Sequence, residues 1–185
     1  MSGAGAERVA MEVHGLALDP NTNAPIVVLR AVESGRILPI WVGIVEASAI
    51  AFELEKVQVA RPMTHDLFLQ TVAAMQGQLN EVAIVDLRDN TYFATLTLTT
   101  AHGPLVMDAR PSDAIALALR AKCPIWCAES VITHVEKAQQ PGENKGSESP
   151  EEPEGPRVIF REDNNPSFDG LLDKLKDSDF GKYKQ

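Results

Sequence analysis

Hydrophobic and polar positions form blocks along the first 136 residues, and the blocks alternate between the spacing of strands and that of helices. Alternating or continuous apolar runs predict strands at about 8–18, 25–33, 37–42, 79–88, 91–100 and 104–109. Apolar residues at helical spacing predict helices at about 44–57, 65–76 and 111–122. The stretch at 88–91, Arg-Asp-Asn-Thr, is typical of a tight turn, because Asp and Asn tolerate left-handed backbone. The pattern predicts a compact single domain of the α/β (α+β) class.

Two parts of this pattern resemble each other at a constant offset of 65 residues. EASAIAFEL at 46–54 aligns with PSDAIALAL at 111–119, and LPIWV at 38–42 aligns with GPLVM at 103–107. Runs of Ala and Ile match easily by chance, but here a strand and a helix recur in the same order. We therefore interpret the domain as an internal ββ-β-α duplication joined by the extra helix at 65–76.

The pattern changes after residue 136. Residues 137–156 are rich in Pro, Gly, Ser and Glu and show no hydrophobic periodicity, which predicts a disordered linker. The C-terminal tail at 157–185 follows, and with the linker it makes an acidic segment, since residues 139–185 hold 11 acids and 7 bases. Within the tail four apolar residues lie on one helical face: Phe168, Leu171, Leu172 and Leu175. A helix of that length is marginal in water, so we expect this segment to be ordered only when it docks on another surface.

The last predicted helix is apolar all round over 114–119, which is typical of a helix buried on every side. Its start is dense in charge, with Asp108, Arg110 and Asp113 around a proline that fits the first helical turn. A carboxylate in that turn complements the helix dipole, and the other repeat has Glu46 at the corresponding place. This indicates either a phosphate-and-metal site or a neutralised structural cap, and the sequence leaves both open.

Composition narrows the classes of function. A net charge of −9 argues against a simple electrostatic binder of nucleic acid, so any basic patch has to be local. No stretch approaches the roughly 20 apolar residues that span a bilayer, and the N-terminal residues lack the basic and apolar segments of a secretory signal. We expect a cytoplasmic protein without membrane contact.

The two cysteines, Cys123 and Cys127, are separated by three residues, and no second pair lies nearby. One histidine, His134, follows seven residues later, which does not complete a zinc site. We predict buried free thiols and no zinc.

Acids and arginines gather in three short stretches beside apolar segments. Grouped carboxylates suit Mg²⁺ or Mn²⁺, interleaved arginines can clamp a phosphate, and a histidine is a candidate general base. The three stretches contribute Arg61, Thr64, His65 and Asp66; Asp86, Arg88 and Asp89; and Asp108, Arg110, Ser112 and Asp113.

Each stretch also has a structural interpretation. Thr64 and Asp66 would cap and charge the start of a helix, which makes His65 an exposed first-turn residue more readily than a catalytic base. The second stretch would supply ordinary hairpin residues, and Arg110 would pair with Asp108 or Asp113. The chain has no Gly-rich phosphate loop and no nucleophile elbow, so spacing alone specifies no reaction.

Three longer stretches together resemble the bifunctional nuclease domain family and cover about residues 8–136. They are LPIWVGIVEASAIAFELEKVQVARPMTHDL, VAIVDLRDNTYFATLTL and MDARPSDAIALALRAKCPIW. The resemblance implies a compact, internally repeated α/β domain that associates with itself, and nuclease activity on DNA and RNA. The recurrent polar positions of the family match Glu46 and all the polar candidates given above.

The leading hypothesis is a metal-dependent nuclease of low sequence specificity that hydrolyses phosphodiester bonds in DNA and RNA. The candidate roles are catalysis for His65, Asp86 and Asp113; substrate binding for Arg61, Arg88, Arg110 and Ser112; and Mg²⁺ or Mn²⁺ binding for Glu46, Asp86, Asp89, Asp108 and Asp113. We expect no organic cofactor, and we expect the protein to form a homo-oligomer. Two hypotheses of other classes stay open: a non-catalytic regulatory or scaffold module, and a small-anion or nucleotide sensor that uses helix N-termini.

Overall fold

A computed structural model describes residues 7–139 of the chain. The predicted tail at 157–185 lies outside the described residues, and so does the linker from residue 140 onward. The strands are β1 (Arg8–Leu18), β2 (Pro25–Ala31), β3 (Ile37–Trp41), β4 (Gln78–Arg88), β5 (Thr91–Thr100), β6 (Gly103–Ala109) and β7 (Ile125–Ala128). The helices are α1 (Ile44–Leu54), α2 (Thr64–Ala74), α3 (Pro111–Ala121) and α4 (Glu129–Gln139).

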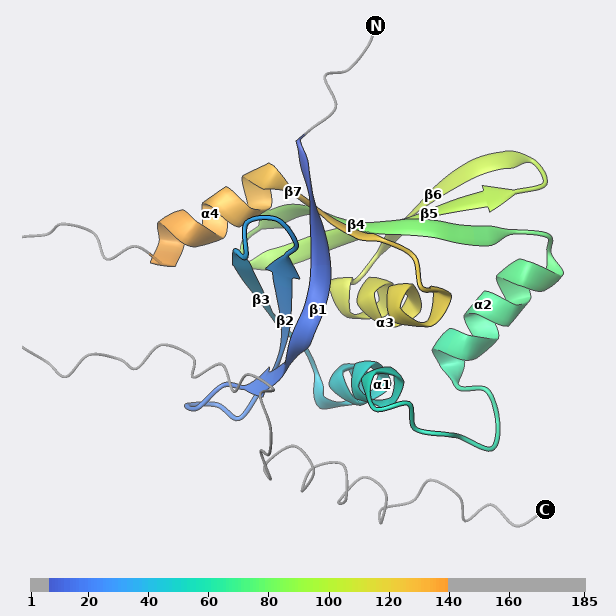
Figure 1. The fold of residues 1–185 in the computed structure, drawn as a ribbon, viewed down its shortest axis with the longest axis horizontal. Coiled ribbons are helices and arrows are strands. Elements are labelled where there is room, and N and C mark those ends of the chain that lie inside the picture. Colours follow the sequence, from blue (N-terminus) through green and yellow to red (C-terminus); the bar gives the residue numbers. More distant parts are fainter. Residues whose placement is uncertain (1–6, 140–185) are drawn as a thin grey trace, which may run out of the picture.

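The seven strands form one mixed sheet in the order β3-β2-β1-β7-β4-β5-β6. Neighbouring strands are antiparallel except for β4 and β7, which are parallel. Figure 1 shows the two halves of the sheet crossing at a large angle, with β1, β2 and β3 steep and β4, β5 and β6 nearly horizontal. This confirms the predicted mixed α/β single domain.

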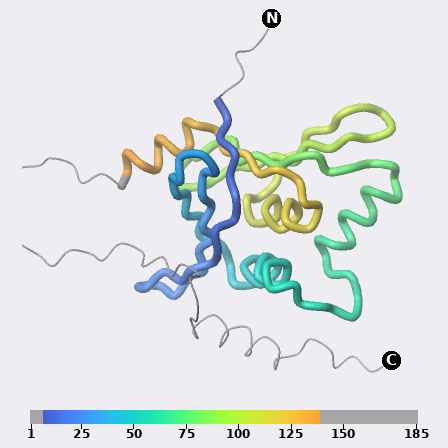
Figure 2. The backbone as a smooth tube through the Cα atoms, in the orientation of Figure 1, coloured from blue at the N-terminus to red at the C-terminus, as the bar shows by residue number. Residues whose placement is uncertain are grey.

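The predicted repeat is visible in the order of the elements. Three antiparallel strands and a helix occur twice, as β1-β2-β3-α1 and β4-β5-β6-α3, and α2 joins the two units. The first strand of each unit borders β7, so the two units lie on opposite sides of that strand. The equivalent helices α1 and α3 lie side by side (Figure 2). The ββ-β-α repeat is therefore present in the structure.

Small side chains allow α1 and α3 to pack closely. Ala47 and Ala51 are buried on α1, and Ala114 and Ala118 are buried on α3. Interaxial distance depends on the side chains at the contact, so alanines on both helices favour a short one. The buried helix predicted from the sequence is confirmed, since Ala114, Ile115 and Ala116 are fully buried.

Two local predictions also hold. Asp89 and Asn90 both have positive φ, at 48° and 57°, in the turn between β4 and β5. Cys127 is a buried free thiol and Cys123 a half-buried one.

No element was predicted after residue 122, and here the structure differs. The four residues of β7 fill the seam between the two repeats, and α4 packs against β7, β4 and β3. Because α4 ends at Gln139, the first three residues of the predicted linker belong to this helix. A run of four residues is too short for periodicity to reveal, and β7 exists because β1 and β4 each offer it an edge.

Strand β6 forms one edge of the sheet and is unusually exposed. Its central residues Leu105, Val106 and Met107 are 46%, 62% and 38% exposed. Residues 90–107 contain no Asp, Glu, Lys or Arg. Charged residues are a common protection of edge strands against pairing with other chains, and on β6 the only charged residue is Asp108, near the end of the strand.

Candidate functional site

The charge at the start of α3 is organised by Arg110. Arg110 is the N-cap residue of α3 with extended backbone, Pro111 occupies the first helical turn, and Asp113 follows in the same turn. This is the local arrangement that the sequence predicted. Arg110 makes no side-chain cap hydrogen bond to the helix, so its guanidinium is available for partners on neighbouring elements.

Arg110 bridges two carboxylates from two helices. Its Nε lies 2.7 Å from Oδ2 of Asp113 and its Nη2 lies 3.1 Å from Oδ1, while its Nη1 lies 2.8 Å from Oε1 of Glu46 on α1. The arginine side chain is 65% exposed, whereas the side chains of Glu46 and Asp113 are 23% and 33% exposed. The predicted pairing of Arg110 with Asp113 is thus present, and the carboxylate of the other repeat joins it.

His65 completes the group from a third helix. Its Nε2 lies 3.3 Å from Oδ1 of Asp113, and its side chain is 17% exposed. His65 is in the first turn of α2, where the sequence placed it, but it contacts α3 and is largely covered. We call Glu46, His65, Arg110 and Asp113 the helix-junction cluster.

The electrostatics of the helix-junction cluster favour its ionised form. Burial by itself raises the pKa of Asp113, but hydrogen bonds from Arg110 and His65 outweigh burial and hold that pKa below its ordinary value of 3.8. The hydrogen bonds from Arg110 to Asp113, and to a smaller extent the one to Glu46, raise the pKa of the guanidinium. Asp113 is therefore a carboxylate at neutral pH and can orient the His65 ring.

The remaining candidates do not join the helix-junction cluster. Asp86 pairs with Arg88, whose Nε lies 2.6 Å away, and Arg88 also lies over the ring of Phe93. Within residues 7–139, no hydrogen bond or ion pair connects the cluster to Asp86, Arg88, Asp89 or Asp108. The predicted single constellation is therefore divided, with the hairpin residues forming a separate exposed pair.

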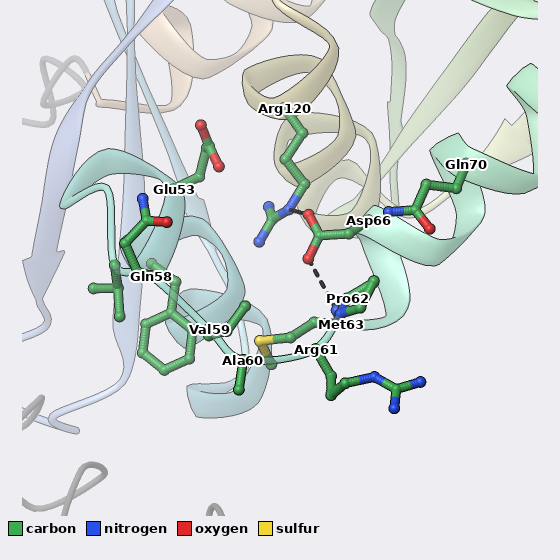
Figure 3. Close-up of a pocket in the computed structure, with 12 residues that line it drawn as sticks. Glu53, Gln58, Val59, Ala60, Arg61, Pro62, Met63, Asp66, Gln70 and Arg120 are labelled. Carbon is green, nitrogen blue, oxygen red and sulfur yellow. Dashed lines mark hydrogen bonds and ion pairs between the residues drawn. The ribbon is translucent and has the colours of Figure 1, made fainter.

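Ser112 and Arg61 were both predicted to bind substrate, and they have opposite surroundings. Ser112 is only 7% exposed, so it does not contribute to an accessible surface. Arg61 is exposed in the loop before α2 and, in Figure 3, points away from the interior.

The predicted metal ligands do not form a preorganised site. The described part of the chain contains no group of three or more His, Cys, Asp or Glu side chains placed to hold a metal ion. Arg110 lies between Glu46 and Asp113 and occupies the space between the two carboxylates, and Arg88 balances the charge of Asp86. These carboxylates, arranged as they are, do not fit a shared divalent ion.

A second polar group lies farther along α3. The Arg120 side chain is only 6% exposed. Its Nε donates a hydrogen bond to Oδ1 of Asp66, its Nη1 to the carbonyl oxygen of Ala116 and its Nη2 to that of Ala49, and each of the three distances is 2.9 Å. Oδ2 of Asp66 accepts a hydrogen bond from the backbone N–H of Met63, the N-cap residue of α2. The capping role predicted for Asp66 is confirmed, whereas the same role predicted for Thr64 is wrong, because Met63 is the N-cap and Thr64 is the first helical residue.

Arg120 was not among the sequence candidates. One signal was available: Arg120 follows Asp113 by seven residues, which places both on the same face of a helix. Asp66 and Arg120 also line a pocket of about 340 Å³ between the end of α1, the loop at 55–63 and the start of α2 (Figure 3).

Comparison with known proteins gives this geometry a context. The family model described as the bifunctional nuclease domain matches residues 27–140. The chain belongs to the bifunctional nuclease domain family. The match includes the three helices of the helix-junction cluster and both arginine-centred groups on α3.

Among curated relatives of this bifunctional nuclease domain chain, two are uncharacterized proteins of Mycobacterium tuberculosis, from strains CDC 1551 and H37Rv. Each is 38% identical over 170 residues, which is 92% of this chain and 96% of the relative. Bifunctional nuclease 1 of Arabidopsis thaliana is 32% identical over 105 residues, which is 55% of this chain and 32% of the relative. Within the described residues, no helix has the length and apolar character needed to cross a membrane.

Proposed function

We propose that this bifunctional nuclease domain protein hydrolyses phosphodiester bonds in DNA and RNA with low sequence specificity. Family membership supports the reaction class, and one structural observation supports the location. Three helices bring a histidine, an arginine and two carboxylates together at the helix-junction cluster.

The contact between His65 and Asp113 suits general acid–base catalysis. With Nε2 donating its proton to the Asp113 carboxylate, Nδ1 of His65 is left as a proton acceptor. In the proposed reaction Nδ1 takes a proton from water, the water oxygen attacks phosphorus, and the bond from phosphorus to the leaving oxygen breaks. The leaving oxygen takes a proton from solvent water, and the protonated His65 ring returns its proton to solvent, so that the overall reaction consumes one water molecule.

Arginine side chains supply the charge that a phosphate needs. Arg110 is 65% exposed and lies beside the His65–Asp113 pair, so its outward face is accessible to a phosphate oxygen. Arg61 in the loop before α2 is a second exposed cation on the same approach to α2. The whole chain has a net charge of −9, so its binding to nucleic acid requires such local cations.

Dependence on Mg²⁺ or Mn²⁺ stays a prediction. Bound metal would polarise a phosphoryl oxygen and lower the pKa of water. Because Arg110 lies between Glu46 and Asp113, the mechanism proposed above uses only side chains of this chain. Cleavage measured with Mg²⁺, with Mn²⁺ and with EDTA decides the question.

The test is cleavage of fluorescently labelled single-stranded DNA, duplex DNA and RNA by highly purified full-length protein. Asp113→Asn should slow cleavage by about 10²-fold or more, the size of general acid–base effects. Glu33→Gln makes the same change of charge at an exposed turn residue and serves as the matched control. Asp86→Asn tests the separate hairpin pair.

The outcomes separate the candidates. Loss of cleavage in Asp113→Asn alone places the chemistry at the helix-junction cluster, and loss in Asp86→Asn alone moves it to the hairpin. Equal cleavage by all variants would identify a contaminant or a different site. No cleavage under any condition would contradict the nuclease proposal.

A regulatory or scaffold module is the second candidate. The observation in its favour is that Arg110 forms ion pairs with both Glu46 and Asp113, as in a structural cap that ties α1 to α3. In that case Asp113→Asn lowers the melting temperature and the purified wild type cleaves no substrate.

A further inference from the structure

The pocket beside α2 is built for a ligand smaller than a nucleotide chain. Its volume of about 340 Å³ is near the lower end of the 300–1,000 Å³ typical of small-molecule sites. Apolar and polar side chains share the lining equally: Phe52, Val57, Val59, Ala60, Pro62 and Met63, then Glu53, Gln58, Arg61, Asp66, Gln70 and Arg120. Figure 3 shows the loop at 58–63 curving around one side of the pocket.

A buried guanidinium lines the interior. Arg120 is only 6% exposed, and its three described hydrogen bonds use three of the five N–H groups that an arginine carries. Two N–H groups on its terminal nitrogens are left for an acceptor. In Figure 3 its side chain extends from α3 toward Asp66 and the pocket.

The ion pairs of the lining argue against a phosphate in the interior. Arg120 is neutralised by Asp66, and Glu53 is paired with Lys56 over 2.9 Å. Arg61 points outward in Figure 3, so its charge is at the rim. A neutral, flat molecule with hydrogen-bonding edges fits such a pocket better than an anion, because the side-chain amides of Gln58 and Gln70 both donate and accept.

The pocket and the helix-junction cluster share two helices. His65 of the cluster and Asp66 of the pocket are consecutive on α2, and Asp113 and Arg120 are seven residues apart on α3, a rise of about 10 Å. A phosphate at the cluster and its attached base in the pocket would span this separation. Arg61 is exposed at the rim of the pocket, where it could contact the next phosphate of the same strand.

We propose that this pocket binds one unstacked nucleobase of a single-stranded substrate whose phosphate lies at the helix-junction cluster. The inference rests on the proposed nuclease function and specifies its substrate as a strand with an extruded base. The apolar residues of the lining contact the faces of the base, while the N–H groups of Arg120 and the two glutamine amides meet its edges, as in other proteins that read unstacked bases.

The experiment titrates isotope-labelled full-length protein with adenosine, guanosine, cytidine and uridine, and follows backbone amide shifts by NMR. Ribose 5-phosphate, which has a phosphate and no base, is the comparison ligand. Val59→Trp fills the pocket from a residue that is 44% exposed, so folding should be unaffected. Val32→Trp makes the same substitution at a residue that is 58% exposed and not in the pocket lining, and it is the matched control.

We expect at least one nucleoside to shift the amides of residues 57–63, with affinity reduced at least tenfold in Val59→Trp and unchanged in Val32→Trp. Equal shifts with ribose 5-phosphate, equal affinity in Val59→Trp, or no nucleoside binding would each overturn the base pocket.

Cleavage by the same proteins separates the two proposals. Cleavage by wild type and Val59→Trp at equal rates, without nucleoside binding, overturns the base pocket and leaves the nuclease proposal in place. Nucleoside binding at 57–63 with no cleavage by any protein supports the base pocket and contradicts the nuclease proposal.

Discussion

Arg120 and Asp66 form an ion pair between α3 and α2, with Nε and Oδ1 2.9 Å apart and the arginine side chain only 6% exposed. The same guanidinium donates to carbonyl oxygens of α1 and α3, so one side chain ties three helices together. Removing one partner of a buried pair is costly because the other charge is left without compensation.

Replacing Arg120 with Leu should therefore lower the free energy of unfolding by about 3–5 kcal/mol. Urea denaturation followed by circular dichroism measures this change. Arg61→Leu removes an exposed arginine of the neighbouring loop and should change stability by less than about 0.5 kcal/mol. Similar losses in the two variants would show that Arg120 has no special structural role.

The pair formed by Arg110 and Glu46 should contribute much less to stability. Arg110 is 65% exposed, and solvent weakens such a contact to at most about 1 kcal/mol. A double-mutant cycle of Glu46→Gln and Arg110→Gln, measured by the same denaturation, gives this coupling energy. A coupling well above that value would mean that the pair is shielded from water.

Acidification should weaken the helix-junction cluster through Asp113. The pKa of Asp113 is below 3.8 in the folded chain, because hydrogen bonds from Arg110 and His65 outweigh the effect of burial. The stabilisation is therefore present at neutral pH and disappears as the pH falls through the folded pKa. The melting temperature of the wild type should exceed that of Asp113→Asn at pH 7, and the difference should shrink below pH 3.8. A difference that is constant over this range would contradict an ionised Asp113.

Cys127 should resist alkylation in the folded protein. Burial raises the pKa of its thiol to about 12, with a further contribution from Glu129 that Arg36 partly opposes, so little reactive thiolate exists near neutral pH. Burial also raises the pKa of Cys123. Mass spectrometry after iodoacetamide treatment should find both thiols unmodified in the folded protein and modified in urea. Rapid labelling of Cys127 in the folded protein would show that this region opens easily.

Self-association stays a prediction, and β6 is the surface on which we expect it. The strand has an open backbone edge, Leu105, Val106 and Met107 are exposed, and Asp108 is the only charged residue of the strand. A second copy pairing along this edge would satisfy its open backbone groups and place new side chains beside these three. Val106→Lys should shift the protein to a smaller species in analytical ultracentrifugation, whereas Val32→Lys, at another exposed valine, should not. An identical sedimentation profile for wild type and Val106→Lys would exclude this edge.

Helix starts and turns could be predicted from the sequence because they depend on residues that are close together in the chain. A proline and an aspartate in the first turn mark the start of α3, and Asp89 and Asn90 mark the turn after β4, because backbone preference acts over a few residues. The repeat of strand and helix predicted the architecture around β7, although β7 itself was missed. A short strand between two larger units has no periodicity of its own.

The sequence by itself determined the α/β class, the repeat, the buried α3 and the presence of acids beside arginines, since these follow from local pattern and composition. Only the tertiary structure decided which acids meet which arginines. Glu46, His65 and Asp113 come from three helices, and Asp86 with Arg88 turned out to be separate. The reason is physical: partners 48 and 64 residues apart in the chain meet only after packing has fixed the relative positions of the helices.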